Sequence, residues 1–213
     1  MITDDKSRKE LKFFGTVSAS VSHDLKNVFA IINEDAGLLE DLVLLAGKGV
    51  DLDPAKLSAV ASKIQKQIQR GDRIVKNMNV FAHSVDENIC NIDVGSTLEL
   101  VYTLMKRKLS TKVVEVEFLA DEKVTVTTDY FLFEMIAGHV LKTAINCAAT
   151  GKITVRTGKD GDAAFVEIAQ IIADSDYYDE NILVEMIKAV DGELLFDKSS
   201  GVLKISLPGS LSI

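Results

Sequence analysis

Apolar residues recur at heptad spacing through two long segments, residues 13–45 and 54–82, and this repeat limits how the start of the chain can fold. In the first segment the repeating positions are Phe14, Val21 and Val28, and beside them Ser18, Leu25, Ile32 and Leu39. In the second they are Leu57, Ile64, Gly71 and Met78, and beside them Ala61, Ile68, Val75 and Ala82. Helices with seams of this period pack against partner helices.

The two segments are predicted to form an antiparallel hairpin. Ala46-Gly47-Lys48-Gly49 ends the first helix, and Asp53-Pro54 supplies an N-cap and a first-turn proline for the second. Gly71 sits where a larger residue would continue its series, which predicts close packing or a kink. Two such hairpins close their seams as a four-helix bundle, so we expect a homodimer with contacts within residues 14–82.

The face opposite the seam of the first helix carries a histidine. At about 100° per residue, His23 lies roughly 180° from a seam centred on Val21 and Leu25. Small or short side chains share its face, namely Ala19, Asn27 and Ala30. We therefore expect an exposed imidazole that a large partner can reach.

Composition excludes several classes of function. A chain of 213 residues that is 47% hydrophobic and carries a net charge of −8 is globular and is unsuited to nucleic acid or anionic lipid as main partner. There is no apolar run of membrane-spanning length and no signal-peptide core, so we expect a cytoplasmic protein that binds no membrane. Cys90 and Cys147 lack metal-ligand spacing and are expected to be reduced.

After a linker at residues 86–91 the pattern changes to a mixture of helices and strands. Helices are expected at 94–109, 131–149 and 180–190, and strands at 113–118, 124–127, 153–157, 164–168, 194–196 and 202–207. This order predicts an α+β protein of two domains. Residues 1–88 form the helical hairpin, and residues 89–213 form an α/β sandwich with helices on one sheet face.

The chain resembles the core of bacterial sensor histidine kinases. Ser22-His23-Asp24-Leu25-Lys26-Asn27 matches their H-box on a helical hairpin, and residues 129–145 lie where the ATP-binding domain of the family has its N-box helix. Asp191-Gly192-Glu193 and the strand before Pro208 match the end of that domain. The resemblance implies a dimerisation and phosphoacceptor hairpin followed by a histidine-kinase-ATPase-like domain.

Two departures argue against ATP binding. The N-box asparagine that holds magnesium in the family is Thr143 here, and the asparagine four residues earlier is His139. No glycine occurs between Asp162 and Asp191, where the family has its adenine motif, lid and phosphate motif. We therefore expect a sandwich that lacks the ATP lid and binds no cofactor. The resemblance is then to dimeric histidine phosphotransferases of phosphorelays.

The resemblance assigns roles around His23. His23 is the expected phosphoacceptor, Asp24 sets the imidazole tautomer, and Asn27 orients a phosphoryl oxygen or a water. The residues expected to contact a docking partner are Ala19, Ser20, Lys26 and Ala30. The partner is expected to be a response-regulator receiver domain that brings its own Mg²⁺.

Three functions remain open at this point. The first is phosphoryl transfer at His23 to and from receiver aspartates, without ATP-dependent kinase activity. The second is a non-catalytic module that binds a receiver or a kinase, and the third is a divergent ATP-dependent histidine kinase. His83 is interpreted as a helix-end residue that favours the helix dipole, and His139 as a packed or pocket histidine.

Overall fold

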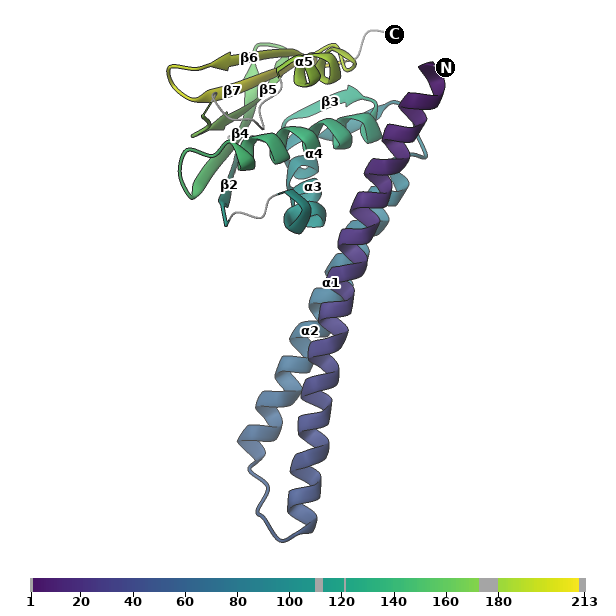
Figure 1. Ribbon diagram of the computed structural model, residues 1–213, viewed down its shortest axis with the longest axis vertical. Helices are drawn as coiled ribbons and strands as arrows, with labels where there is room; N and C mark the ends of the chain where they lie inside the picture. Colours follow the sequence, from purple (N-terminus) through teal and green to yellow (C-terminus); the bar gives the residue numbers. More distant parts are fainter. Residues whose placement is uncertain (1, 110–112, 121, 173–179, 211–213) are drawn as a thin grey trace. The chain divides into compact units, whose positions relative to one another are not determined.

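Two long helices precede an α+β domain in the computed structural model, which describes residues 2–109, 113–120, 122–172 and 180–210 (Figure 1). The predicted α+β fold class is thereby confirmed. The chain divides into two compact units, Val17–Val80 and a second unit that combines Met1–Thr16 with Phe81–Ile213. The predicted separation into domains 1–88 and 89–213 remains a prediction.

The first unit consists of most of helices α1 (Ile2–Gly47) and α2 (Pro54–His83), which form the predicted hairpin. The Asp53 carboxylate accepts a hydrogen bond of 2.9 Å from the backbone N–H of Ala55, as expected of an N-cap. The turn between the helices contains Gly49 at φ +88°. The predicted helices are thus present, and α1 begins eleven residues earlier than the apolar repeat.

The hairpin is closed by small and β-branched side chains. Val17, Val28 and Val60 are almost fully buried. A Cβ atom on Gly71 would lie 3.4 Å from Cγ1 of Val28, which is an ordinary van der Waals contact, so the close packing predicted at this glycine stays a prediction. α2 is helical without interruption at this point.

Only part of the predicted seam is covered within one chain. On α2, Leu57, Ile64 and Met78 are half-buried. By contrast, Ile68 is 56% exposed and Val75 44% exposed, and on α1 Phe29 is 63% exposed. The hairpin therefore has a second apolar surface that its own helices leave in solvent.

The second unit contains a five-stranded sheet of order β2-β4-β5-β7-β6. Its strands are β2 (Glu115–Ala120), β4 (Lys152–Asp160), β5 (Ala163–Ala169), β6 (Glu193–Asp197) and β7 (Val202–Leu207). β2 pairs with β4 in parallel, and the other neighbours are antiparallel. A separate antiparallel pair is made by β1 (Cys90–Asp93) and β3 (Thr125–Thr128).

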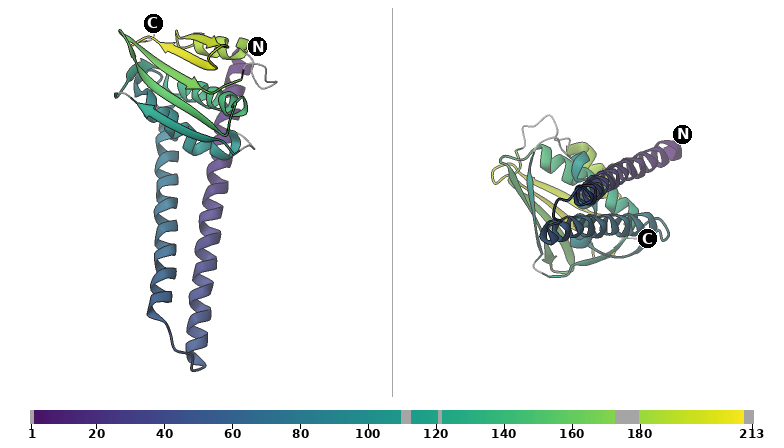
Figure 2. Two further views of the ribbon diagram at one scale, coloured as in Figure 1. Left: turned by 90° about the vertical axis from the view of Figure 1, so that its left-hand side faces the viewer. Right: turned by 90° about the horizontal axis from the view of Figure 1, so that it is seen from below.

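Three helices lie on one face of this sheet, as predicted: α3 (Val94–Leu109), α4 (Tyr130–Asn146) and α5 (Glu180–Lys188) (Figure 2). The core lies between the two layers and is formed by alternate strand residues such as Ile153, Val155 and Ile168, together with Leu98 and Leu141 of the helices. The sheet thus buries its inner face beneath α4, the helix that carries the N-box-like sequence.

The sequence misplaced several element boundaries. Residues 90 and 91 of the expected linker belong to β1, which pairs with β3. Val113 is 97% exposed, and pairing in β2 begins only where Glu115 meets Lys152. The β4–β5 hairpin is also longer than predicted, because its turn lies at Gly161, whose φ of +63° suits glycine.

An aromatic cluster ties the start of α1 and the end of α2 to α4 within the second unit. The Phe13 ring makes edge contacts with Phe81 at 5.8 Å and with Phe131 at 5.9 Å between centroids, and Phe14 stacks on Phe81 at 5.5 Å. A Cβ atom on Gly138 would lie 2.8 Å from Cε2 of Phe13. The absence of a side chain at Gly138 therefore lets the Phe13 ring approach α4. Across the described ranges, the helices fall short of the combination of length and apolar character needed to cross a membrane.

Candidate functional site

His23 lies on the solvent side of α1 in the hairpin unit, as its helical phase predicts. Its ring contacts a residue one turn further along the helix: Nδ1 of His23 and Nδ2 of Asn27 are 3.2 Å apart. Asn27 is half-buried, and His23 is exposed. The structure therefore brings together two of the three predicted site residues and leaves the imidazole open to solvent.

The contact with Asn27 has a consequence for the imidazole tautomer. The nitrogen and oxygen of a side-chain amide exchange places by a rotation of about 180° and differ in hydrogen bonding, since only the oxygen accepts. With the oxygen toward His23, Nδ1–H donates to Asn27 and Nε2 keeps its lone pair. With the nitrogen toward His23, Nδ1 accepts and Nε2 carries the proton. Asn27 thus has the position to select the nitrogen that can act as nucleophile.

Asp24 follows His23 in the sequence and is half-buried. Within the residues that the structure describes, no hydrogen bond joins Asp24 to His23. The physical reason is helix geometry, because adjacent side chains point about 100° apart. The predicted role of Asp24 in setting the tautomer remains a prediction. Asn27 makes the contact with Nδ1 of His23 that was expected of the Asp24 carboxylate.

The predicted docking residues are not equally accessible. Ala19, Lys26 and Ala30 are exposed, so they fit a surface around His23. Ser20 is only 1% exposed and its Oγ is buried. The role of Ser20 in contacting a partner stays a prediction, and in the single chain this side chain is covered although it lies only about 60° from His23 around the helix.

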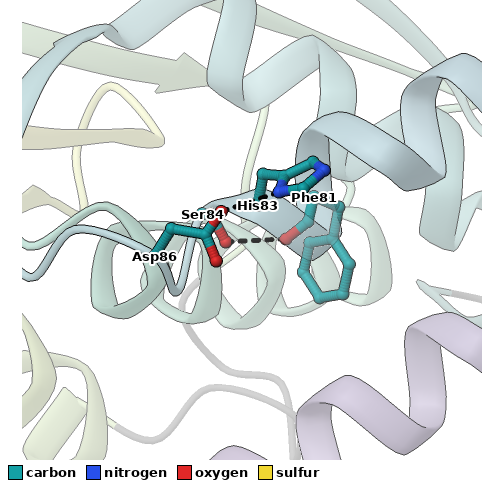
Figure 3. A network of polar contacts seen from close by, with 4 residues as sticks. All are labelled: Phe81, His83, Ser84 and Asp86. Atoms are coloured by element: carbon teal, nitrogen blue, oxygen red, sulfur yellow. Dashed lines mark hydrogen bonds and ion pairs between the residues drawn. The ribbon is translucent and has the colours of Figure 1, made fainter.

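The other two histidines have different surroundings. His83, in the last turn of α2, makes a 2.7 Å contact through Nδ1 to Oδ2 of Asp86, and both side chains are largely exposed (Figure 3). His139 is half-buried on α4. Neither belongs to a cluster of metal-binding side chains in the part of the chain that the structure describes.

Two observations bear on the expectation that the chain binds no nucleotide, which stays a prediction. Thr143, which replaces the magnesium-binding asparagine of the resemblance, is 6% exposed. The connection from Gln170 to Asp179 was predicted to lack a lid, and residues 173–179 of it lie outside the described residues. The absence of glycine from Asp162 to Asp191 is a property of the sequence itself.

Sequence analysis did not identify a buried acid that lies on α4. Glu134 is 0% exposed, and its Oε2 lies 2.6 Å from the Ser84 hydroxyl oxygen. The available signal was an acidic residue between apolar neighbours in Phe131-Leu132-Phe133-Glu134-Met135-Ile136. Such a residue is expected either to face solvent or to be held by a specific partner.

Comparisons with known proteins give structural likeness but no sequence family. No protein-family model matches the chain, and no curated protein is significantly similar to it. The histidine kinase AdeS of Acinetobacter baumannii is similar at a TM-score of 0.49 and 13% identity, over 87% of this chain and 97% of that one.

Two further solved structures are similar over smaller shares of the chain. The catalytic domain of histidine kinase ThkA matches at a TM-score of 0.48 and 14% identity, over 59% of this chain and all of that domain. The blue-light-activated histidine kinase EL346 of Erythrobacter litoralis matches at 0.45 and 17% identity, over 75% of this chain and 64% of that one. The chain itself has two N-terminal helices followed by an α+β sheet domain.

Proposed function

We propose that this chain is a histidine phosphotransferase of a two-component phosphorelay, which accepts a phosphoryl group at His23 from one receiver aspartate and donates it to another. The observation that carries the proposal is the solvent-exposed His23 imidazole whose Nδ1 contacts Asn27, on a helical hairpin with an H-box sequence. Ala19 and Ala30 leave room on the same helix face for a receiver to approach.

The transfer step uses the neutral imidazole. The Nε2 lone pair attacks the phosphorus of an aspartyl phosphate, the Nε2–P bond forms, and the P–O bond to the aspartate breaks with its electron pair leaving on the carboxylate. Nδ1 keeps its proton and donates it to Oδ1 of Asn27 when the Asn27 amide is rotated by about 180° from the orientation in which Nδ2 faces the ring. Asp24 lowers the energy of the ring as positive charge develops on it. The reverse sequence passes the group to a second receiver.

Charge on the phosphoryl oxygens is balanced by groups from both proteins. Lys26 is exposed on the same part of α1 and lies next to the path of the incoming phosphoryl group. Mg²⁺ is expected to arrive with the receiver aspartate, and this chain supplies no cofactor of its own. The absence of phosphate-binding glycines between Asp162 and Asp191 supports a role that does not use ATP.

The active form is proposed to be a cytoplasmic homodimer. The second apolar surface of the hairpin, which includes Phe29, Ile68 and Val75, is the surface that a second copy would cover. Joining two hairpins in this way forms a four-helix bundle. His23 lies on the opposite side of α1 from its seam, so dimerisation leaves it accessible to a receiver.

Two incubations test the proposal. Purified protein is mixed with a receiver domain carrying labelled phosphoryl, and separately with labelled ATP and Mg²⁺. Labelling from the receiver alone supports a phosphotransferase, and labelling from ATP alone identifies a divergent kinase. Binding of the receiver without any transfer of label identifies the non-catalytic module instead.

A further inference from the structure

The end of α2 is attached to α4 by a buried chain of hydrogen bonds within the second unit. The Ser84 hydroxyl oxygen lies 2.8 Å from the carbonyl oxygen of Phe81, as Figure 3 shows, and 2.6 Å from Oε2 of Glu134. Ser84 is 2% exposed and Glu134 is 0% exposed. Three oxygen atoms therefore share two short contacts out of reach of solvent.

The number of hydrogen atoms available to these two contacts determines the protonation state of Glu134. A serine hydroxyl has one hydrogen, and a backbone carbonyl oxygen can only accept. If the Ser84 hydrogen points to the Phe81 carbonyl, the second short contact needs a hydrogen from Glu134. Both contacts are satisfied together only when the Glu134 carboxyl is protonated and donates to the Ser84 oxygen.

The surroundings of Glu134 also favour the neutral acid. Its other oxygen, Oε1, is buried without a hydrogen-bond partner, and an ionised oxygen in that position would be costly. No lysine, arginine or histidine of the described chain forms an ion pair with it. The titratable groups that its charge affects are the Cys90 thiol on β1 and the Tyr130 hydroxyl on α4, and neither is cationic.

We propose that Glu134 and Ser84 form a proton-dependent latch, in which a protonated Glu134 holds the last turn of α2 on α4 and loss of the proton releases that turn. The latch is independent of whether His23 accepts a phosphoryl group. Ionisation would leave two buried carboxylate oxygens with one serine hydrogen to serve them. Release of the turn admits water to the carboxylate.

The direction of the pH response follows from the pKa. Burial raises the pKa of the Glu134 carboxyl to about 8, although its hydrogen bond with Ser84 lowers it. The corresponding pKa in the unfolded chain is near 4.5, so the folded state binds the proton more tightly. The stabilisation is complete below that lower value and is lost as pH rises toward 8 and beyond, by up to about tenfold in the folding constant per pH unit.

The experiment follows the carboxyl group directly in the full-length protein. Glutamate labelled with ¹³C at Cδ is incorporated, and NMR spectra are recorded from pH 4 to pH 9.5. One resonance, absent in Glu134→Gln, is expected to titrate with a midpoint near 8. A Glu134 resonance with its midpoint near 4.5 overturns the proposal. If Glu134→Gln does not fold, the unmodified protein still decides, because a Glu midpoint near 8 is either present or absent.

Hydrogen exchange then tests the latch itself. Between pH 6.5 and pH 9, after correction for the intrinsic exchange rate, amides of Phe81–Ser84 are expected to lose at least tenfold protection in the unmodified protein. Glu134→Gln keeps a neutral donor and is expected to retain that protection at both pH values. Glu99→Gln, on the exposed face of α3, serves as the matched control and is expected to behave as the unmodified protein. Equal loss of protection in Glu134→Gln and the unmodified protein contradicts the latch.

Discussion

The side-chain amide of Asn27 lies 3.2 Å from Nδ1 of His23, one turn away on the same face of α1. Both residues belong to one helix, so their contact needs no other element to place it. A hydrogen-bond partner of Nδ1 determines whether Nε2 carries a proton, because the neutral imidazole has a single proton. Asn27 is therefore a positioning residue for His23 under the proposed phosphotransfer.

Replacement of Asn27 by alanine should slow phosphoryl transfer about tenfold, with little change in receiver binding. The rate should fall because a larger share of the imidazole then carries its proton on Nε2, the nitrogen that must attack. Groups that position a proton in this way contribute at least about tenfold to a rate. The measurement is single-turnover transfer from a labelled phospho-receiver across pH 5.5–8.5. Asn33→Ala, at an exposed position on α1, is the control. Equal rates for both variants would remove Asn27 from the mechanism.

A charge at Ile68 should prevent dimer formation without unfolding the hairpin. Ile68 is 56% exposed in the single chain, so a carboxylate there is hydrated in the monomer and desolvated only in a dimer. Light scattering at micromolar concentration should give a dimer for the unmodified protein and a monomer for Ile68→Glu, with equal helical circular dichroism. Gln69→Glu adds the same charge one residue further on and should stay dimeric. An unmodified protein that is already monomeric would disprove the predicted assembly.

Adding a methyl group at Gly138 should destabilise the second unit. The new Cβ would lie 2.8 Å from Phe13 Cε2 and 3.2 Å from Met105 Sδ, and the Phe13 ring is held by Phe81 and Phe131. Overpacking costs about 1–3 kcal/mol, against a gain of about 1 kcal/mol in helix propensity. Urea unfolding should show Gly138→Ala to cost less in a Phe13→Leu background. Identical costs in both backgrounds would show that the two residues are not coupled.

ATP should not bind specifically. Calorimetry with millimolar ATP and Mg²⁺ is expected to give only dilution heats, because Thr143 is buried and glycines are absent between Asp162 and Asp191. A receiver domain that binds the same protein preparation provides the positive control. A one-site ATP isotherm would favour a divergent histidine kinase over a phosphotransferase.

Local sequence signals predicted the features that depend on one segment at a time. The apolar repeat, the Asp53 cap and the exposed phase of His23 all follow from the geometry of a single helix, and each is present in the structure. Strand β7 was predicted at residues 202–207, where alternation and the turn at Gly201 coincide.

Features that depend on contact between segments distant in the sequence could not be predicted from local patterns. Strand β1 is defined by its pairing with β3, which lies more than thirty residues away. The burial of Ser20 depends on what covers α1, and the burial of Glu134 depends on the packing that brings Ser84, fifty residues earlier, against it. A local pattern contains no information on such partners, although an acid in an apolar helix does indicate that one is needed.

Mapping the phosphorylated residue shows whether His23 is the phosphoacceptor. A labelled phospho-receiver is mixed with the unmodified protein and with His23→Ala, and the label is located by mass spectrometry under alkaline conditions that preserve phosphohistidine. We expect label on His23 of the unmodified protein and none on His23→Ala. Both proteins should keep the same oligomeric state and bind the receiver equally, because an exposed side chain contributes little to folding. Equal labelling of His23→Ala, or no labelling of a protein that binds the receiver, would contradict this expectation.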